Sequence, residues 1–215
     1  MTGPHEGRPV VSAGMALGES PAVMIMIHGR NASPRNILDV ARALDRPRFT
    51  YVAPAAAGNT WYPFSFMAET MTNEPGLTSG LAVLRSLVDD VMARGIRADH
   101  IVLLGFSQGA CLTAEFAVRN ATRYGGVIAF SGGLIGPPGT TWEHPGSFEA
   151  TPIFLGCSDV DAHVPKQRVD ESAAVFGRMG GVVTERIYPG MGHLVNDDEI
   201  AFTRSLMDGL LADSS

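Results

Sequence analysis

Residues 101–121 read IVLLGFSQGACLTAEFAVRNA and combine three local signals in one stretch. The run IVLLGF is apolar on both faces, as expected of a strand buried in a parallel sheet. The run ACLTAEFAVRNA that follows has the spacing of a helix. Between the two lies the pattern Gly-x-Ser-x-Gly, centred on Ser107. We therefore interpret this stretch as a strand, a sharp turn and a helix.

The turn in this stretch carries a serine between two glycines. In a strand–turn–helix context the pattern is typical of a nucleophile elbow, a strained turn that lifts the serine hydroxyl clear of the sheet. Gly105 and Gly109 let such a turn close, and the alanines that follow allow the helix to pack closely. A glycine-rich turn with an incidental serine is the alternative, which the context disfavours. Ser107 is the candidate nucleophile.

The rest of the chain alternates short apolar runs with helical patterns. This alternation predicts an α/β fold with a largely parallel sheet. The predicted strands cover about residues 8–12, 22–28, 49–53, 100–105, 125–130, 152–157 and 182–187. Apolar side chains recur every three or four positions in the segments around Ile37, Leu84, Val169 and Phe202, which predicts helices there. We expect one domain over residues 1–215.

Composition limits the classes of function. Of 215 residues 45% are hydrophobic and 18% charged, and the net charge is −6. Without a basic face, neither a nucleic-acid partner nor attraction to anionic lipid is expected. The longest strongly apolar run, residues 22–27, is too short to span a bilayer, and the first residues lack a secretory signal pattern. Cys111 and Cys157 match neither a disulfide framework nor a metal site, so we expect a reduced, cytoplasmic protein.

Two connections, residues 54–76 and 132–151, are long for a compact α/β domain and rich in Gly, Pro and aromatic residues. Loops of this length often contribute to function. If both surround the elbow, their large apolar side chains are candidates for binding an acyl or alcohol group. These candidates are Trp61, Tyr62, Phe64, Phe66, Leu134 and Trp142, with Met67 and Met71 as a further apolar wall. A small core beneath the loops explains the aromatic residues equally well.

A serine hydroxyl needs a neighbouring base to take its proton. In the chain order that accompanies this elbow, the acid follows the serine and the histidine comes last. Only His193 lies beyond the final predicted strand. Most carboxylates between serine and histidine fall on predicted helices or strands or in the long loop, which leaves Asp159 and Asp161, and spacing does not choose between them. His163 is interpreted as a residue of the site's rim.

Acyl transfer also needs N–H groups that stabilise a developing negative charge. One predicted donor is the backbone N–H of Gln108, the residue after the nucleophile. The other is the backbone N–H of Arg30, in the loop after the strand at 22–28, where Gly29 permits close approach. We favour a structural role for the Arg30 side chain, with contact to an acidic group of the substrate as the alternative.

Four motifs coincide in this chain: HGR at 28–30, GFSQGA at 105–110, GCSDVDAHVP at 156–165 and GMGH at 190–193. Together they resemble the phospholipase/carboxylesterase family of α/β-hydrolases, which includes the acyl-protein thioesterases, over about residues 22–200. The resemblance implies an α/β-hydrolase fold of about seven mostly parallel strands without a large cap, and no cofactor. It places a catalytic triad on Ser107, Asp161 and His193 and the oxyanion donors on Arg30 and Gln108.

The chain departs from the thioesterase-type members at two places. Asn31 stands where they carry another glycine, but asparagine tolerates a left-handed backbone, so we expect the turn to be kept. The segment Thr60-Trp61-Tyr62-Pro63 replaces a tryptophan–phenylalanine–aspartate segment, which weakens acyl-protein specificity and leaves ester hydrolysis intact.

We therefore expect a serine carboxylesterase that hydrolyses small-molecule carboxylic esters through an acyl-enzyme intermediate. A thioesterase or lysophospholipase for longer acyl chains is one alternative, and a non-catalytic ligand-binding α/β-hydrolase is another. A third alternative is a surface-interaction protein whose aromatic loops bind a partner, with a homodimer as one form.

Overall fold

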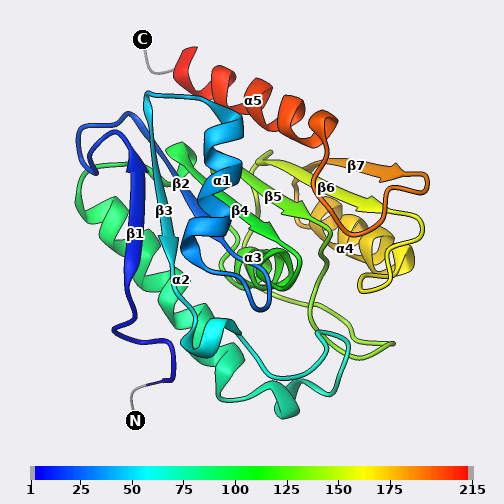
Figure 1. Cartoon of the computed structure of the whole chain (residues 1–215). Helices are drawn as coiled ribbons and strands as arrows, with labels where there is room; N and C mark the ends of the chain where they lie inside the picture. Colours follow the sequence, from blue (N-terminus) through cyan, green and yellow to red (C-terminus); the bar gives the residue numbers. More distant parts are fainter. Residues whose placement is uncertain (1–2, 213–215) are drawn as a thin grey trace.

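The computed structural model describes residues 3–212 and contains a central sheet of seven strands (Figure 1). The strands are β1 (Val10–Gly14), β2 (Ala22–Ile27), β3 (Phe49–Pro54), β4 (Ile101–Phe106), β5 (Gly126–Phe130), β6 (Pro152–Ser158) and β7 (Val182–Tyr188). The helices are α1 (Pro34–Leu44), α2 (Gly76–Ala93), α3 (Gln108–Arg119), α4 (Lys166–Arg178) and α5 (Asp197–Ala212), with single 3₁₀ turns at η1 (Ala57–Asn59), η2 (Thr70–Asn73) and η3 (Ala98–His100). The predicted seven-stranded, mostly parallel α/β architecture is confirmed.

The order of the strands in the sheet brings the HGR motif at 28–30 and the GFSQGA motif at 105–110 together. The order is β1-β3-β2-β4-β5-β6-β7, and only β1 runs antiparallel to its neighbour. From β2 the chain moves first toward one edge and then, with β4, toward the other. The carboxyl ends of β2 and β4 are therefore adjacent, with Ile27 opposite Gly105. Such a reversal of strand order is where open α/β sheets bind ligands.

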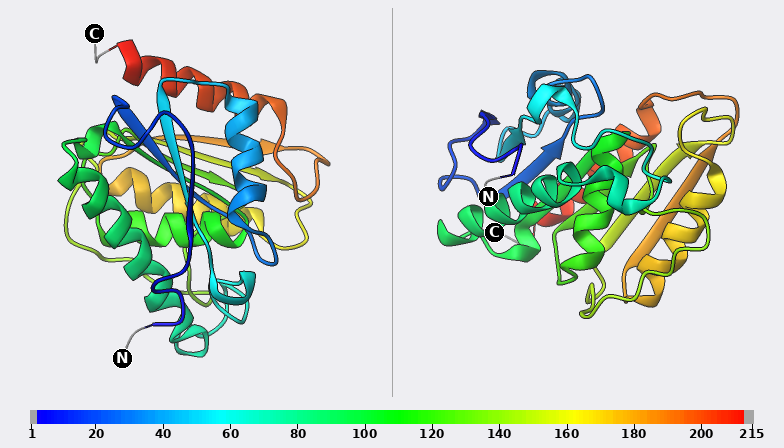
Figure 2. Two further views of the ribbon diagram at one scale, coloured as in Figure 1. Left: turned by 60° about the vertical axis from the view of Figure 1, so that its left-hand side comes forward. Right: turned by 90° about the horizontal axis from the view of Figure 1, so that it is seen from below.

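Helices cover both faces of the sheet, and each face has its own apolar core (Figure 2). Strand β2 is buried along its whole length. Its alternate residues Val23, Ile25 and Ile27 join the core shared with α2, α3 and α4. Met24 and Met26 join the core shared with α1 and α5. Continuous burial explains why the strand reads as an unbroken apolar run.

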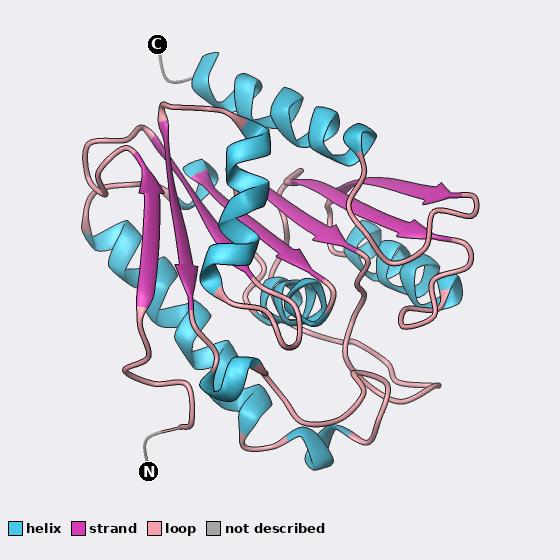
Figure 3. Cartoon of the chain, viewed as in Figure 1, coloured by secondary structure: helices cyan, strands magenta, loops and turns pink. Residues whose placement is uncertain are grey.

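The two long connections contain only short turns and no additional domain. Figure 3 shows both running beyond the ends of the strands along one edge of the molecule. They contact each other where the Gly136 N–H donates to the Phe66 carbonyl at 2.8 Å. None of the helices between residues 3 and 212 combines the length and hydrophobicity that crossing a bilayer requires.

The second long connection is held by a buried arginine of α4. The side chain of Arg168 is 1% exposed, and its guanidinium donates to the carbonyls of Leu134 at 2.8 Å and Gly136 at 2.7 Å. Its Nε donates to Glu171 at 2.9 Å. The guanidinium also lies 5.1 Å from the Trp142 ring centroid. A planar fork with several donors suits this role better than a lysine ammonium would.

We expect Arg168→Met to lower the free energy of unfolding by about 3 to 5 kcal/mol. Methionine has similar volume but leaves buried carbonyls without donors, and each such loss costs on the order of 1–3 kcal/mol. Urea denaturation followed by circular dichroism measures the change. Arg178→Met, at an exposed position of the same helix, is the matched control and should change stability by less than about 1 kcal/mol. Equal effects of the two variants would contradict the role given to Arg168.

Candidate active site

Ser107 occupies the turn between β4 and α3 in a strained backbone conformation. Its φ is 56° and its ψ is −122°, a combination that residues other than glycine rarely adopt. Two backbone hydrogen bonds hold it there: the Ser107 N–H donates to the Phe130 carbonyl at 2.9 Å, and the Cys111 N–H donates to the Ser107 carbonyl at 3.0 Å. The strained backbone thus belongs to the residue that the sequence identifies as the candidate nucleophile.

The two glycines of the motif are required by close backbone contacts. A Cβ on Gly105 would lie 2.3 Å from the Gly109 carbonyl oxygen. A Cβ on Gly109 would lie 2.2 Å from the Ile27 carbonyl oxygen, in the neighbouring strand. No side chain fits at either position without moving the backbone. The glycine pattern therefore follows from packing α3 against the ends of β2 and β4.

The structure brings Ser107, His193 and Asp161 together. The Ser107 Oγ lies 2.8 Å from His193 Nε2, and His193 Nδ1 lies 2.7 Å from Asp161 Oδ2. The histidine comes from the loop after β7 and the aspartate from the loop after β6. All three residues follow parallel strands, so they meet at one edge of the sheet. The Asp161 side chain is fully buried, whereas 20% of the His193 side chain remains exposed.

Asp161 is fixed in its ionised form by several donors. Besides His193, the backbone N–H groups of His163 and Val164 donate to its Oδ1 at 2.8 and 3.0 Å. Burial alone would raise the pKa of Asp161, but these hydrogen bonds outweigh burial and hold the pKa below its usual value. The carboxylate is therefore charged at neutral pH and able to orient the imidazole.

Asp159, the other candidate acid in the sequence analysis, makes a different contact. Its Oδ1 accepts a hydrogen bond from the Gly190 N–H at 2.8 Å. Asp159 is exposed and supports the loop that carries His193, whereas Asp161 contacts the imidazole itself. Geometry thus separates two carboxylates that spacing could not.

The two predicted oxyanion donors lie on either side of Ser107. Gln108 is the first residue of α3, and Arg30 follows the end of β2. Within residues 3–212, neither backbone N–H has an acceptor. A Cβ on Gly29 would lie 3.3 Å from the Ser107 Cβ, so the two loops are in close contact. Asn31 has a φ of 60°, which confirms that asparagine supplies the left-handed turn here.

The Arg30 side chain holds the first long connection. Its guanidinium donates to the carbonyls of Pro63 at 2.8 Å and Phe64 at 2.6 Å. It also lies 5.9 Å from the centroid of the Tyr62 ring. The side chain therefore has the structural role that we favoured, with backbone carbonyls rather than a carboxylate as partners.

The Gln108 side chain holds the same connection from the other side. Its Oε1 accepts a hydrogen bond from the Trp61 N–H at 2.9 Å, and its Nε2 donates to the Tyr62 carbonyl at 2.8 Å. Both contacts are buried. The glutamine of the GFSQG motif thus positions the loop that walls the site, a role that the sequence did not reveal.

A cavity of about 520 Å³ opens above Ser107. Tyr62, Phe64 and Phe66 line it, as predicted, together with Phe106 and His163. The Phe106 ring packs on His193 with centroids 5.0 Å apart, and the His163 ring meets His193 edge-on at 4.8 Å. Sequence analysis did not identify Phe106 as a residue of the site, although its place directly before the nucleophile could have indicated this.

Three of the predicted substrate-binding residues lie outside the cavity above Ser107. Trp61 and Leu134 are fully buried, Trp142 is 8% exposed, and none of them lines the cavity. The Trp61 indole donates to the His28 carbonyl at 2.9 Å, and the Trp142 indole donates to the Ile135 carbonyl at 3.1 Å. These side chains form the core beneath the loops, so the prediction that they bind substrate is wrong. Met67 and Met71 do not line the cavity either.

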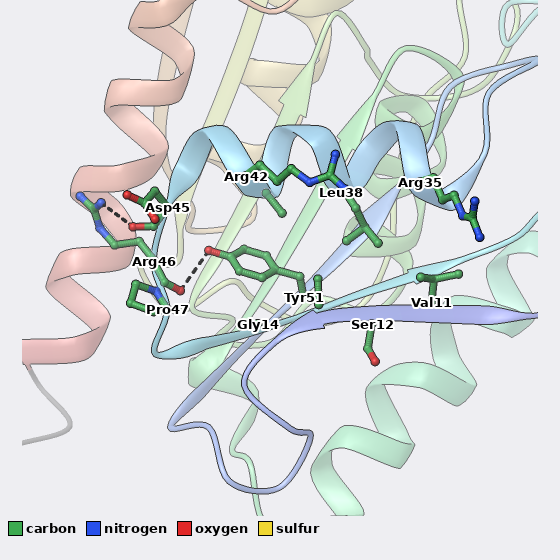
Figure 4. A pocket seen from close by; sticks show the side chains of 12 residues that line it. Val11, Ser12, Gly14, Arg35, Leu38, Arg42, Asp45, Arg46, Pro47 and Tyr51 are labelled. Atoms are coloured by element: carbon green, nitrogen blue, oxygen red, sulfur yellow. Dashed lines mark hydrogen bonds between the residues drawn. The ribbon is translucent and has the colours of Figure 1, made fainter.

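A separate cavity of about 480 Å³ lies between α1 and β1 (Figure 4). Its wall includes Arg46 and Tyr51, whose hydroxyl donates to the Arg46 carbonyl at 3.2 Å. The wall contains neither a histidine nor a cysteine and is remote in sequence from the elbow. In the described part of the chain, no group of three or more His, Cys, Asp or Glu side chains is arranged to hold a metal ion.

A buried carboxyl lies at the end of the loop that carries His193. Glu199 and Asn196 exchange hydrogen bonds of 2.9 Å at the start of α5, each side chain accepting from the other residue's N–H. Glu199 is fully buried, and its second carboxyl oxygen has no partner within residues 3–212. Burial raises the pKa of Glu199 to about 7. The folded protein therefore retains this proton at pH values where the unfolded chain has lost it.

We expect Glu199 to make the protein less stable as the pH rises from 5 to 8. A carboxyl whose pKa is raised by folding contributes its full stability below the unfolded pKa and loses it as the pH rises through about 7. Relative to Glu199→Gln, the wild type should lose about 2.5 kcal/mol of unfolding free energy over this range. Urea denaturation at several pH values measures the slope. Asp197→Asn, at an exposed neighbour, should leave it unchanged; an equal slope in wild type and Glu199→Gln would contradict the expectation.

Comparison with known proteins agrees with this architecture. The sequence model of the phospholipase/carboxylesterase family matches residues 14–209. Acyl-protein thioesterase 1 of Eremothecium gossypii is 31% identical over 73% of this chain and 68% of its own length. A probable carboxylesterase, SOBER1-like, of Arabidopsis thaliana is 26% identical over 66% of this chain. That match covers 55% of the plant protein, so the chain spans about half of this relative.

A solved structure also matches nearly the whole chain. It is a phospholipase/carboxylesterase from Dyadobacter fermentans, 38% identical, with a TM-score of 0.89. The match covers 95% of this chain and 97% of that one. This chain belongs to the phospholipase/carboxylesterase family of α/β-hydrolases and is an enzyme of the serine hydrolase class.

Proposed function

We propose that this chain is a serine carboxylesterase that hydrolyses small-molecule carboxylic esters through an acyl-enzyme intermediate. The observation that carries the proposal is the hydrogen-bonded series from Ser107 through His193 to Asp161, with distances of 2.8 and 2.7 Å. Ser107 and His193 line an open cavity, while the Asp161 side chain lies buried outside its lining. A serine, a base and an orienting acid within hydrogen-bond reach are what nucleophilic catalysis requires.

In the first step, the Ser107 Oγ attacks the ester carbonyl carbon while its proton moves to His193 Nε2. The carbonyl oxygen becomes an oxyanion that accepts hydrogen bonds from the Arg30 and Gln108 N–H groups. Asp161 stabilises the imidazolium that has formed. The bond to the alcohol oxygen then breaks, and His193 Nε2 gives this oxygen its proton. The alcohol leaves and the acyl group remains on Ser107.

In the second step, water attacks the acyl carbon and gives its proton to His193 Nε2. The same two N–H groups stabilise the second oxyanion. When this intermediate collapses, the Ser107 Oγ leaves and recovers the proton from His193. The carboxylic acid is released, and the triad returns to its starting state. No cofactor enters either step.

A thioesterase acting on longer acyl chains is the second candidate. The relative from E. gossypii, which is 31% identical, carries the name of acyl-protein thioesterase. The chemistry of the two steps is the same for a thioester, because only the leaving atom differs. A lysophospholipase would share the acyl step as well. A non-catalytic ligand-binding module is disfavoured, because such a module has no need of three aligned catalytic groups.

The proposal is tested by labelling with a fluorophosphonate, which reacts only with an activated serine. We expect one label per chain, on Ser107, and turnover of p-nitrophenyl butyrate. A series of esters and thioesters from acetyl to palmitoyl then separates a short-chain esterase from a long-chain thioesterase by kcat/KM. A protein that is folded but neither labels nor turns over any member of the series would refute the proposed function.

A further inference from the structure

A second cavity adjoins the triad and shares His193 in its lining with the cavity above Ser107. Its volume is about 470 Å³, and it lies between the start of α1 and the chain that follows His193. The residues specific to this cavity are chiefly Asn36, Ile37, Val40, Leu194 and Val195. We call it the α1 cavity.

The α1 cavity and the cavity above Ser107 share one wall. Gly29, Phe106 and His193 line both. The Phe106 and His193 rings pack at 5.0 Å with an angle of 39° between their planes, so they form a ridge between the two spaces. Ser107 and Gln108 line only the first cavity. A substrate bound across the ridge would thus place one of its two ends on each side.

The path of the proton indicates which end lies where. In the proposed mechanism the leaving oxygen must reach His193 Nε2, because the proton taken from Ser107 is delivered there. The acyl carbon, in contrast, must reach Ser107 and the N–H groups of Arg30 and Gln108. Ser107, Arg30 and Gln108 line only the first cavity, whereas His193 lines both and the two residues after it line only the α1 cavity. The acyl group therefore fits the first cavity, and the leaving group, held at His193 on the border of the two cavities, extends into the second.

The lining of the α1 cavity indicates the chemistry of the group that it accepts. Ile37, Val40, Leu194 and Val195 are apolar, the polar lining residues are asparagines and histidines, and no Asp, Glu, Lys or Arg is among the described residues that line it. The first cavity, in contrast, includes Arg30. Moving a charged group from water into an uncharged site without a partner is unfavourable. An uncharged alcohol is therefore preferred over one carrying an ammonium or a phosphate.

We propose that the α1 cavity, between α1 and the His193 loop, is the leaving-group subsite and selects uncharged, largely apolar alcohols. This inference rests on the proposed esterase function and narrows it. The alcohol released from a lysophospholipid carries a charged phosphate, so such substrates are poor. Small neutral alkyl or aryl esters are favoured.

The test compares two butyrate esters that have the same shape and differ in charge. Butyrylcholine carries a quaternary ammonium, and 3,3-dimethylbutyl butyrate has a neutral carbon in its place. Both form the same butyryl-enzyme, so the ratio of their kcat/KM values reports only the leaving-group side. We expect the neutral ester to be preferred at least about tenfold, equivalent to about 1.4 kcal/mol. The net charge of −6 favours encounter with the cation, so this preference would come from the cavity.

A negative charge placed in the cavity should weaken the preference for the neutral ester. Val40 is half-buried on α1, and Val40→Asp should lower the ratio at least about fivefold, because the carboxylate compensates the ammonium. Val40→Asn tests the polar change without charge and should leave the ratio near that of the wild type. Ala43→Asp puts the same charge at an exposed position of the same helix, outside both cavities, and should also leave it near the wild-type value.

The outcomes separate the two proposals. If the wild type hydrolyses neither ester and takes no fluorophosphonate label, the esterase function itself fails. If it hydrolyses both esters equally, or if Val40→Asp and Ala43→Asp shift the ratio alike, the subsite assignment fails while the function stands. If Val40→Asp instead alters the preference among acyl groups at constant alcohol, the two cavities have been assigned in reverse.

Discussion

Ser107→Ala should lower kcat for p-nitrophenyl butyrate by about 10⁴- to 10⁶-fold, down to the residual rate that binding and the oxyanion hole supply. The reason is that the proposed acyl-enzyme forms on the Ser107 Oγ, 2.8 Å from His193 Nε2. Without this oxygen, His193 can only activate water. Steady-state assays with purified protein, together with loss of fluorophosphonate labelling, measure the effect.

A second substitution at the same position separates loss of chemistry from loss of fold. Ser107 has a φ of 56°, a conformation that costs non-glycine residues on the order of 1 kcal/mol or more. Ser107→Gly should therefore be as inactive as Ser107→Ala but more stable than it, because glycine adopts this backbone without strain. Thermal unfolding compares the two variants. Retention of wild-type turnover by either variant would rule out Ser107 as the nucleophile.

The fold was predictable because its five central strands, β2 to β6, are buried almost throughout. A strand such as β2 must be apolar throughout, so it appears as an unbroken run between polar segments. The elbow was predictable for a related reason: the contacts of Gly105 and Gly109 with neighbouring backbone admit no side chain. Both signals are local in sequence. Close contacts and burial directly determine which residue types can occupy these positions.

The aromatic residues of the long connections were not predictable in the same way. Trp61 and Phe64 are three positions apart, yet Trp61 is fully buried and Phe64 is 57% exposed in the wall of the cavity. A core and a cavity wall both require large apolar side chains. Only the placement of the loop decides between them, and that placement depends on Gln108 and Arg30, which are distant in sequence. The same limit applies to the acid, for which spacing left two candidates.

Asp161→Asn should lower kcat/KM about 10⁴-fold, whereas Asp159→Asn should lower it less than about threefold. At position 161 the carboxylate accepts from His193 Nδ1 at 2.7 Å, which keeps Nε2 free to take the serine proton. An amide can turn its NH₂ toward Nδ1 and stabilise the tautomer that carries its proton on Nε2, which cannot act as the base.

At position 159 the side chain only accepts from the Gly190 N–H, and an amide oxygen accepts this hydrogen bond equally well. The two variants carry the same chemical change two residues apart, so they form a matched pair. Assays of both with p-nitrophenyl butyrate, with circular dichroism to verify folding, measure the difference. If Asp159→Asn proved the more damaging, the imidazole would have to be oriented by Asp159, and the loop after β6 would differ in solution from the arrangement described here. A loss limited to Asp161→Asn would instead locate the orienting charge at Asp161, whose fully buried carboxylate contacts His193.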